Sequence, residues 1–330
     1  MEKIKVIIMG LGPLGVKTVK FASRRNLEIT GAVDINPSVK GKNLGKHCGI
    51  EGLSIPISSS VKEALARAKA DVVILTTVSD VKRIVSQIKE IAECGLHVVS
   101  TCEELSYPWD AHSEGANEID GTAKKCGVAV IGTGVNPGFL MDFLPTALTA
   151  VCQNVEKIKV SRIQNAQFRR VPFQKKIGAG LTLDEFEAKK NDGSLRHVGL
   201  TESIQMIASR MGWKLDRTED IIEAVIAEKD IVTDAITIKA GNAAGVFQTG
   251  RGWSNGKELI SLIFRAAVGE PETYDLVEIT GEPDIRSKIE GGVNGDIATC
   301  AIIINAVKQI IRVSPGLKTM VDIPAVSFFN

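Results

Sequence analysis

Short apolar runs recur along the first part of the chain, and stretches with helical spacing separate them. The helical stretch 81–91, for example, begins after Ser79 or Asp80 and stops before Gly95. Strands without polar alternation are buried on both faces, as in a parallel sheet. The repeat of strand and helix therefore predicts an α/β fold with a doubly wound parallel sheet. The apolar runs lie at residues 5–9, 28–33, 71–77, 96–100 and 127–131.

The residue pattern changes from Asn154 onward, where apolar and polar residues alternate. Such alternation is typical of antiparallel strands with one wet face, and helical stretches at 183–190 and 202–211 interrupt it. We expect a second, α+β domain with a mainly antiparallel sheet. A long apolar helix through Ile311 is expected to rejoin the first domain, which gives domains of 1–137 with 294–330 and of 138–293. The alternating segments lie at 155–163, 220–227, 235–240 and 273–279.

The first apolar run leads into a glycine-rich turn, GLGPLG, at residues 10–15. A strand that breaks into G-x-G-x-x-G and resumes as a helix is typical of a Rossmann domain that receives a dinucleotide pyrophosphate. The first glycine allows the tight turn, the second lets the pyrophosphate approach, and the third lets the helix lie close to the strand. A chance glycine turn is the alternative, since the chain has 31 glycines. The expected cofactor contacts are Gly10, Gly12, Pro13, Leu14 and Gly15.

An acidic residue ends the second apolar run. Asp34 follows the glycine turn by about 20 residues, where a carboxylate accepts hydrogen bonds from ribose hydroxyls and repels a 2′-phosphate. This position favours NAD as the cofactor. Lys40 and Lys42 follow closely and would neutralise the extra phosphate of NADP if Asp34 turned away, whereas a solvated basic loop is the simpler interpretation.

Composition limits the classes of partner and compartment. Of the 330 residues 44% are hydrophobic and 24% are charged, and a net charge of +1 gives no electrostatic case for nucleic acid or an anionic membrane. No apolar run is long enough to span a bilayer. The six cysteines form no C-x-x-C pair and the four histidines show no zinc-ligand spacing, so we expect a reduced cytoplasmic protein without a metal site.

Hydroxyl groups follow two of the later apolar runs. Thr76 and Thr77 end the third run, and Thr101 follows the fourth. The carboxyl ends of parallel strands are the edge where doubly wound sheets bind their ligands, so these hydroxyls would contact the cofactor. The alternative is structural, because threonine is common at the ends of strands.

Carboxylates and a tight turn stand at the same edge. Glu103 and Glu104 follow the fourth run, and either is a candidate for a general base. The competing interpretation is that the dipole of a following helix favours acidic residues there. After the fifth run, two glycines and an Asn-Pro-Gly turn bring Asn136 and Gly138 close to the expected ligand.

Cations gather around glycines in the second domain, at residues 169–180. A solvated basic loop is the default interpretation of such a cluster. The alternative is a site for a substrate carboxylate, which the glycines favour because ordinary surface loops do not need them. Arg169 and Lys176 are the candidate ligands, and His197, which we expect near the start of a helix, is a third.

Several motifs together resemble a known family. They are Val-Asp-x-x-Pro at 33–37, Asn-Pro-Gly-Phe at 136–139, Phe-Gln-x-Lys at 173–176 and Gly-Gly-x-x-Gly-Asp-Ile-Ala-Thr at 291–299. In these motifs the chain resembles the dihydrodipicolinate-reductase-like group, and within it the 2,4-diaminopentanoate dehydrogenases and native amine dehydrogenases. The His-His-x₅-Lys-like stretch expected of a true dihydrodipicolinate reductase is absent, and Asn294 stands where similar sequences often carry histidine.

The resemblance implies a reversible, NAD(P)-dependent oxidative deamination of 2,4-diaminopentanoate to 2-amino-4-oxopentanoate and ammonia. It places the catalytic glutamate at Glu104 or Glu103, with Glu104 preferred, and Asn136 and Gly138 beside the nicotinamide. It also implies that the substrate is bound by the three candidate ligands of the second domain, and it makes a homodimer plausible. The alternatives are an amine dehydrogenase acting on simple ketones, a cyclic-imine reductase, and a cofactor-binding sensor without turnover.

Overall fold

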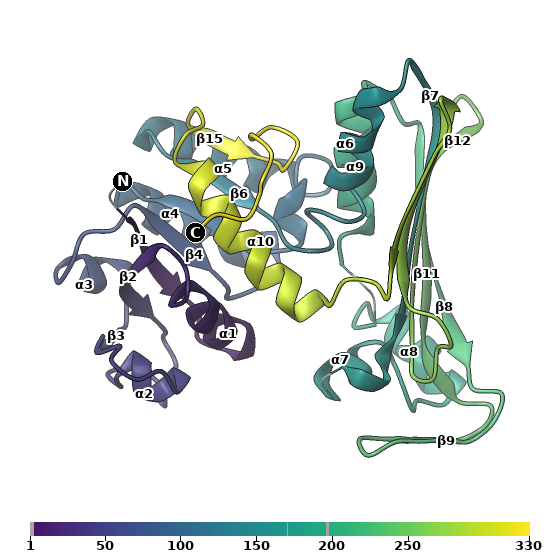
Figure 1. Ribbon diagram of the computed structural model, residues 1–330, viewed down its shortest axis with the longest axis horizontal. Coiled ribbons are helices and arrows are strands. Elements are labelled where there is room, and N and C mark those ends of the chain that lie inside the picture. Colours follow the sequence, from purple (N-terminus) through teal and green to yellow (C-terminus); the bar gives the residue numbers. More distant parts are fainter. Residues whose placement is uncertain (1–2, 170, 196–197) are drawn as a thin grey trace. The chain divides into compact units, whose positions relative to one another are not determined.

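The computed structural model describes residues 3–169, 171–195 and 198–330, and the chain divides into two compact units (Figure 1). Unit 1 comprises Met1–Phe139 and Asn294–Asn330, and unit 2 comprises Leu140–Val293. Unit 1 is therefore assembled from two separate stretches of the sequence. Unit 2 is continuous and is inserted between them.

Unit 1 is built on a seven-stranded sheet with the order β15-β6-β5-β4-β1-β2-β3, in which every pair of neighbours is parallel. All residues of β4 and β6 are buried, as expected for strands covered on both faces. These features confirm the predicted Rossmann-type sheet. The strands are β1 (Ile4–Met9), β2 (Leu27–Val33), β3 (Ile57–Ser58), β4 (Val72–Leu75), β5 (His97–Ser100), β6 (Ala129–Gly132) and β15 (Gly316–Lys318).

Helices cover the sheet of unit 1. α4 and α5 lie side by side, and α10 packs against α1 and against β5 (Figure 1). α4 begins as its sequence predicts, because the Asp80 side chain accepts a hydrogen bond from the N–H of Arg83. The helices are α1 (Pro13–Ala22), α2 (Leu44–Cys48), α3 (Val61–Leu65), α4 (Val81–Glu93), α5 (Ser113–Cys126) and α10 (Gly295–Ile310), with a 3₁₀ turn, η1 (Glu104–Ser106).

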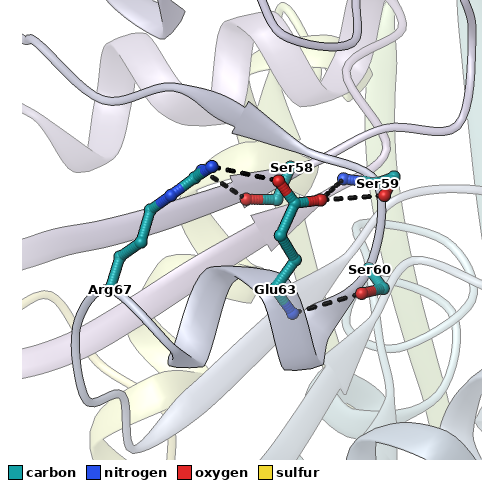
Figure 2. A network of polar contacts seen from close by, with 5 residues as sticks. All are labelled: Ser58, Ser59, Ser60, Glu63 and Arg67. Carbon is teal, nitrogen blue, oxygen red and sulfur yellow. Dashed lines mark hydrogen bonds and ion pairs between the residues drawn. The ribbon is translucent and has the colours of Figure 1, made fainter.

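The turn from β3 into α3 is held by a network of polar side chains (Figure 2). The Ser60 hydroxyl caps α3 by accepting the N–H of Glu63, and the Glu63 carboxylate accepts the N–H and the hydroxyl of Ser59 at 2.7 and 2.8 Å. Arg67 joins Glu63 at 3.0 Å and the Ser58 hydroxyl at 2.9 Å. The bond from the Ser59 N–H is the main reason that the pKa of Glu63 lies below its ordinary value.

Unit 2 contains a six-stranded sheet with the order β14-β13-β7-β12-β11-β8. Its pairs are antiparallel except for β7 with β12, which confirms the predicted mainly antiparallel sheet. The alternating segments missed β11, β12 and β14. The strands are β7 (Asn154–Asn165), β8 (Arg217–Ile226), β11 (Ala243–Ser254), β12 (Lys257–Ala267), β13 (Tyr274–Glu282) and β14 (Ile285–Glu290), with a separate hairpin of β9 (Ile231–Val232) and β10 (Thr237–Ile238).

One face of this sheet carries α9, which contacts α6 (Figure 1). Glycines in β11 let the helix lie close, because a Cβ on Gly250 or Gly252 would be 3.0 Å from the side chain of Ile204. The helices are α6 (Phe143–Leu148), α7 (Val171–Lys176), α8 (Leu183–Asn191) and α9 (Leu200–Met211), with 3₁₀ turns η2 (Thr149–Val151) and η3 (Ala166–Phe168).

Candidate active site

The carboxyl ends of the seven parallel strands lie at one edge of the unit 1 sheet. β1 and β4 are neighbours there, although they are far apart in sequence, because the strand order reverses between them. Such a reversal is where doubly wound sheets bind ligands. The glycine turn follows β1 and Asp34 follows β2, while the candidate threonines and glutamates follow β4 and β5. The fold therefore brings the candidate groups of unit 1 to one edge.

The three glycines of the turn have different surroundings. A Cβ on Gly10 would lie 2.8 Å from the carbonyl oxygen of Thr76, and one on Gly15 would lie 1.8 Å from that of Gly10. A Cβ on Gly12 would meet nothing within 4 Å. Gly10 and Gly15 are thus required by the packing of the protein itself, whereas Gly12 borders open space in front of α1.

The N-terminus of α1 lies next to the open space at Gly12. Pro13 occupies the first helical position, where its missing N–H costs no helical hydrogen bond. The N–H groups of Leu14 and Gly15 belong to the first turn, so they have no acceptor within the helix and point along its axis. Helix dipoles favour anions at this end. Open space at Gly12 beside N–H donors fits a dinucleotide pyrophosphate.

Asp34 is fixed beside the glycine turn. Its Oδ2 accepts the N–H of Leu11 at 2.7 Å, and its Oδ1 accepts the N–H of Asn36 at 2.8 Å. The backbone of Ser58 also holds this position, because its carbonyl accepts the N–H of Asp34 at 3.1 Å. Each carboxylate oxygen has a further lone pair to accept a hydroxyl, so the group is oriented for a ribose. The nearby Lys40 and Lys42 are exposed.

The candidate threonines make hydrogen bonds within the protein. The Thr76 hydroxyl donates to the carbonyl of Gly10 at 2.7 Å and so ties β4 to the glycine turn. The Thr77 hydroxyl donates to Gln87 at 2.8 Å, and that of Thr101 approaches the carbonyl of Leu75 at 3.5 Å. All three therefore have a structural role, while an accepting role towards the cofactor stays a prediction.

The two glutamates differ in their contacts. Glu104 is 8% exposed, and its Oε2 accepts the N–H of Val81 at 2.9 Å and lies 3.1 Å from Nε2 of His112. Glu103 is half-buried and precedes η1. The sequence gives no sign of His112, which lies in an irregular segment just before α5 and joins Glu104 only through the fold.

A cysteine lies next to these carboxylates. Cys102 is 1% exposed, and burial raises the pKa of its thiol to about 12, with the neighbouring Glu104 and Glu103 adding to the shift. The thiol is therefore protonated at neutral pH. Because only the thiolate is a good nucleophile, this arrangement excludes Cys102 as a nucleophile in the ground state of the protein.

The turn after β6 is tightly folded. Gly138 has φ of +122°, and a Cβ there would lie 2.6 Å from Oγ1 of Thr133. The N–H of Val135 reaches Thr299 on α10 at 3.3 Å, which ties the turn to that helix. Asn136 is 7% exposed. Thr133 was not predicted as a site residue, yet its hydroxyl is buried without a hydrogen-bond partner among the described residues, which marks this turn as a place for a polar ligand group.

In unit 2, Arg169 is held by its neighbours. Its guanidinium stacks on the ring of Phe173 at 4.1 Å and donates to Oε1 of Gln164 at 3.0 Å. The amide nitrogen of Gln174 donates to the carbonyl of Arg169 at 2.9 Å. Lys176 is exposed at the end of α7. The candidate His197 lies outside the described residues.

A buried ion pair supports this loop. Arg162 and Asp275 are 2.6 Å apart with side chains 3% and 5% exposed, and they hold the N–H and carbonyl of Val293 at 2.7 and 2.8 Å. Gln164, which binds Arg169, also donates to Val293 at 3.3 Å. Burial lowers the pKa of Arg162, and Asp275 opposes that shift. The side chain of Gln164 thus connects Arg169 to Val293, the last residue of unit 2.

Three further observations concern metals, membranes and cysteines. Among residues 3–169, 171–195 and 198–330, no group of three or more His, Cys, Asp or Glu side chains is placed to hold a metal ion. Within the same ranges, no helix has the length and apolarity needed to cross a membrane. All six cysteines are free thiols.

Comparison with families and curated proteins covers nearly the whole chain. A model of the 2,4-diaminopentanoate dehydrogenase C-terminal domain matches residues 139–329, and a model of the dihydrodipicolinate reductase N-terminus matches residues 4–106. The 2,4-diaminopentanoate dehydrogenase of Acetoanaerobium sticklandii is 36% identical over 339 residues, which cover 98% of this chain and 94% of that protein.

Solved structures share the fold. The amine dehydrogenase from Mycobacterium smegmatis matches with a TM-score of 0.86 at 20% identity, covering 99% of this chain and 97% of that one. The WlbA dehydrogenase from Bordetella pertussis, solved with NADH and UDP-GlcNAcA, matches with a TM-score of 0.54 at 13% identity, covering 93% and 88%. At these identities the likeness concerns the fold alone.

Proposed function

Because this chain belongs to the 2,4-diaminopentanoate dehydrogenase family, we propose that it catalyses the NAD(P)-dependent oxidative deamination of 2,4-diaminopentanoate to 2-amino-4-oxopentanoate and ammonia, reversibly. The observation that carries this proposal is 36% identity to a curated enzyme of that name across 98% of the chain. The edge of unit 1 supports it, since the open space at Gly12 and the oriented Asp34 fit a dinucleotide.

We propose NAD as the preferred cofactor. When bound, the nicotinamide supplies the hydride acceptor. Gly12, Leu14 and Gly15 would hold the pyrophosphate, and Asn136 and Gly138 would flank the nicotinamide. Asp34 supports NAD over NADP, because two backbone N–H groups hold its carboxylate at the end of β2, where it would repel a 2′-phosphate.

The protein must also move protons. A substrate ammonium has to lose a proton before its carbon can release hydride, and the water that attacks the resulting iminium loses another as the carbinolamine forms. A carboxylate at Glu103 or Glu104 would accept these protons and return one to the departing ammonia. In balance, an ammonium, NAD⁺ and water give a ketone, NADH, NH₄⁺ and one proton.

We propose that the cations of unit 2 recognise the amino-acid end of the substrate. Arg169 is held by Gln164 and by the ring of Phe173, which suits a directional bond to a carboxylate. Lys176 and His197 remain candidates for the same end. Replacing Arg169 by Ala should then damage turnover of the diamino acid but hardly affect a simple amine.

The test is a spectrophotometric assay of NAD⁺ and NADP⁺ reduction with 2,4-diaminopentanoate, other diamino acids and simple amines. We expect turnover with the diamino acid and a higher kcat/KM with NAD⁺. Turnover of simple amines alone would replace the proposed substrate by the simple-amine alternative. Tight NADH binding without turnover of any amine or of a cyclic imine would favour a sensor.

We further propose a homodimer that forms through the sheet face of unit 2 opposite α9. Side chains next to Gly250 along β11 point to that face, and the strand register places an apolar and small-residue row across it. Rows of charged residues flank it, and their charges pair within the chain, as between Lys159 and Glu278 at 3.1 Å. Two copies could therefore meet there without bringing an excess of like charge together. The row is Ile221, Thr249, Ile263, Ser161 and Leu276, and it ends at Lys288 on β14. Of its members Ile221 is exposed and Ile263 is half-buried.

Light scattering tests the dimer. Ile263→Asp should convert a dimer to a monomer, while Val232→Asp, at a 74% exposed position of the β9 strand, should not. A monomeric wild type would contradict the proposal.

The free state of all six cysteines supports the expected reducing, cytoplasmic location.

A further inference from the structure

We propose that Glu104 and His112 form a positioning pair that fixes the 102–106 turn, and that the adjacent Glu103 is the carboxylate that accepts protons. The family resemblance implies Glu104 or Glu103 for the proton transfers, with Glu104 preferred, whereas the contacts around the two residues lead to the opposite division of roles. This inference rests on the proposed deamination. It adds His112, which no motif indicates, and it gives adjacent glutamates separate tasks.

Glu104 is anchored by two donors on one oxygen. Its Oε2 accepts the N–H of Val81, the first residue of α4, at 2.9 Å, and it lies 3.1 Å from Nε2 of His112, just before α5. The side chain of Glu104 is 10% exposed and that of His112 is 20% exposed. The carboxylate therefore joins the starts of two helices, and a swing towards a substrate would break both bonds.

The backbone of the same turn is tied on other sides. The N–H of Glu104 reaches the carbonyl of Ser79 at 3.4 Å, and the carbonyl of Glu103 accepts both the N–H and the hydroxyl of Ser106, at 3.2 and 2.8 Å. Leu105 is fully buried against Gly132, where a Cβ would lie 2.6 Å from its backbone. The Cα of Glu103 is thus fixed at the carboxyl end of β5.

Position matters for proton transfer, because a base acts only within hydrogen-bond reach of the proton it accepts. A displacement of about 1 Å in such a group costs on the order of a hundredfold in rate. If Glu104 and His112 hold the turn, their truncation should lower kcat by that order and leave the KM for NAD⁺ unchanged. The isosteric Glu104→Gln should restore most of the rate, because its amide oxygen still accepts both hydrogen bonds.

The experiment measures kcat and KM for Glu103→Gln, Glu104→Gln, Glu104→Ala and His112→Ala. We expect Glu103→Gln to lose about 10²- to 10⁴-fold in kcat with NADH binding intact, and Glu104→Gln to stay within about tenfold of the wild type. A loss in Glu104→Gln as large as in Glu103→Gln, or full activity in Glu103→Gln, would overturn the assignment. Thermal melts identify any variant that fails to fold.

Hydrogen exchange separates this inference from the proposed reaction. Glu104→Ala and His112→Ala should speed amide exchange at the start of α4 and in residues 103–113, and Glu104→Gln should not. Glu118→Gln is the matched control, because it removes a surface carboxylate that pairs with Lys89 between the same two helices. Unchanged exchange in Glu104→Ala would refute the positioning role whatever the substrate. Changed exchange in a protein that turns over no amine would refute the reaction alone.

Discussion

In unit 1 the candidate groups are held mainly by backbone atoms, whereas in unit 2 they are held by side chains. Asp34 accepts two backbone N–H groups, and Gly10 and Gly15 are packed against carbonyls. Arg169, in contrast, is held by Gln164, which shares Val293 with the buried Arg162. Backbone support depends on no particular side chain in the partner, so it resists single substitutions, whereas side-chain support fails when one member is removed.

The largest effect should come from breaking the side-chain support of unit 2. Arg162→Met leaves the buried Asp275 without its ion partner, and such a loss costs about 3–5 kcal/mol. The loss should appear as a lower free energy of unfolding in a denaturant titration. The double variant Arg162→Met, Asp275→Leu should recover much of the stability, because no uncompensated charge stays buried. A single variant as stable as the wild type would show that the pair does not support the loop.

The glycine turn offers the matching test in unit 1. Gly15→Ala places a Cβ against a carbonyl and should destabilise the protein by about 1–3 kcal/mol or more. Gly12→Ala meets no protein atom within 4 Å and has φ of −67°, which alanine adopts, so its melting temperature should not change. Its NADH affinity, measured by fluorescence titration, should fall about tenfold or more, equivalent to at least 1.4 kcal/mol. Equal NADH affinity would mean that the cofactor does not pass Gly12.

Asp34 tests the charge at the end of β2. Asp34→Asn removes the repulsion of a 2′-phosphate and keeps an acceptor oxygen for one of the two backbone N–H groups, so the ratio of kcat/KM for NADP⁺ over NAD⁺ should rise about tenfold. Asp71→Asn is the control, because Asp71 accepts the N–H of Lys5 at 2.7 Å at the opposite end of the strands. An unchanged ratio in Asp34→Asn would remove Asp34 from the ribose site.

The smallest effect concerns the exposed network at α3. The folded protein lowers the pKa of Glu63, so its stabilisation is present above the ordinary value of about 4.3 and is lost as the pH falls through the lowered one. Glu63→Gln should therefore melt slightly below the wild type at pH 7, and the two melting curves should converge under acid conditions. A constant difference at every pH would assign the effect to packing rather than to the charge.

The elements of unit 1 could be predicted because their signals are local. The glycine turn, the Asp80 cap and the uninterrupted apolar strands each occupy a few consecutive residues, and the structure contains all of them. In unit 2, β11 was missed because glycine and polar residues such as Gln248 obscure its alternation. The glycines let α9 lie close to the strand, and Gln248 donates a hydrogen bond to Asp220 at 2.8 Å.

The candidate site, too, could be predicted only in part from the sequence. The position of the glutamates after β5 follows from sequence, but the contact of Glu104 with His112 depends on where the segment before α5 turns back. The buried hydroxyl of Thr133 and the connection from Val293 to Arg169 arise in the same way, from side chains that only the fold brings together. No spacing rule relates such residues.

The discontinuity of unit 1 sets an order of assembly during synthesis. Unit 2, Leu140–Val293, is complete when the ribosome has still to add α10 and β15. α10 supplies Cys300, fully buried beside Thr18 of α1, so the helix behind the glycine turn gains this packing partner only after unit 2 has been synthesised. The nascent chain therefore carries the whole of unit 2 before unit 1 can be completed, and a chain that stops after Val293 lacks the helix that packs against α1.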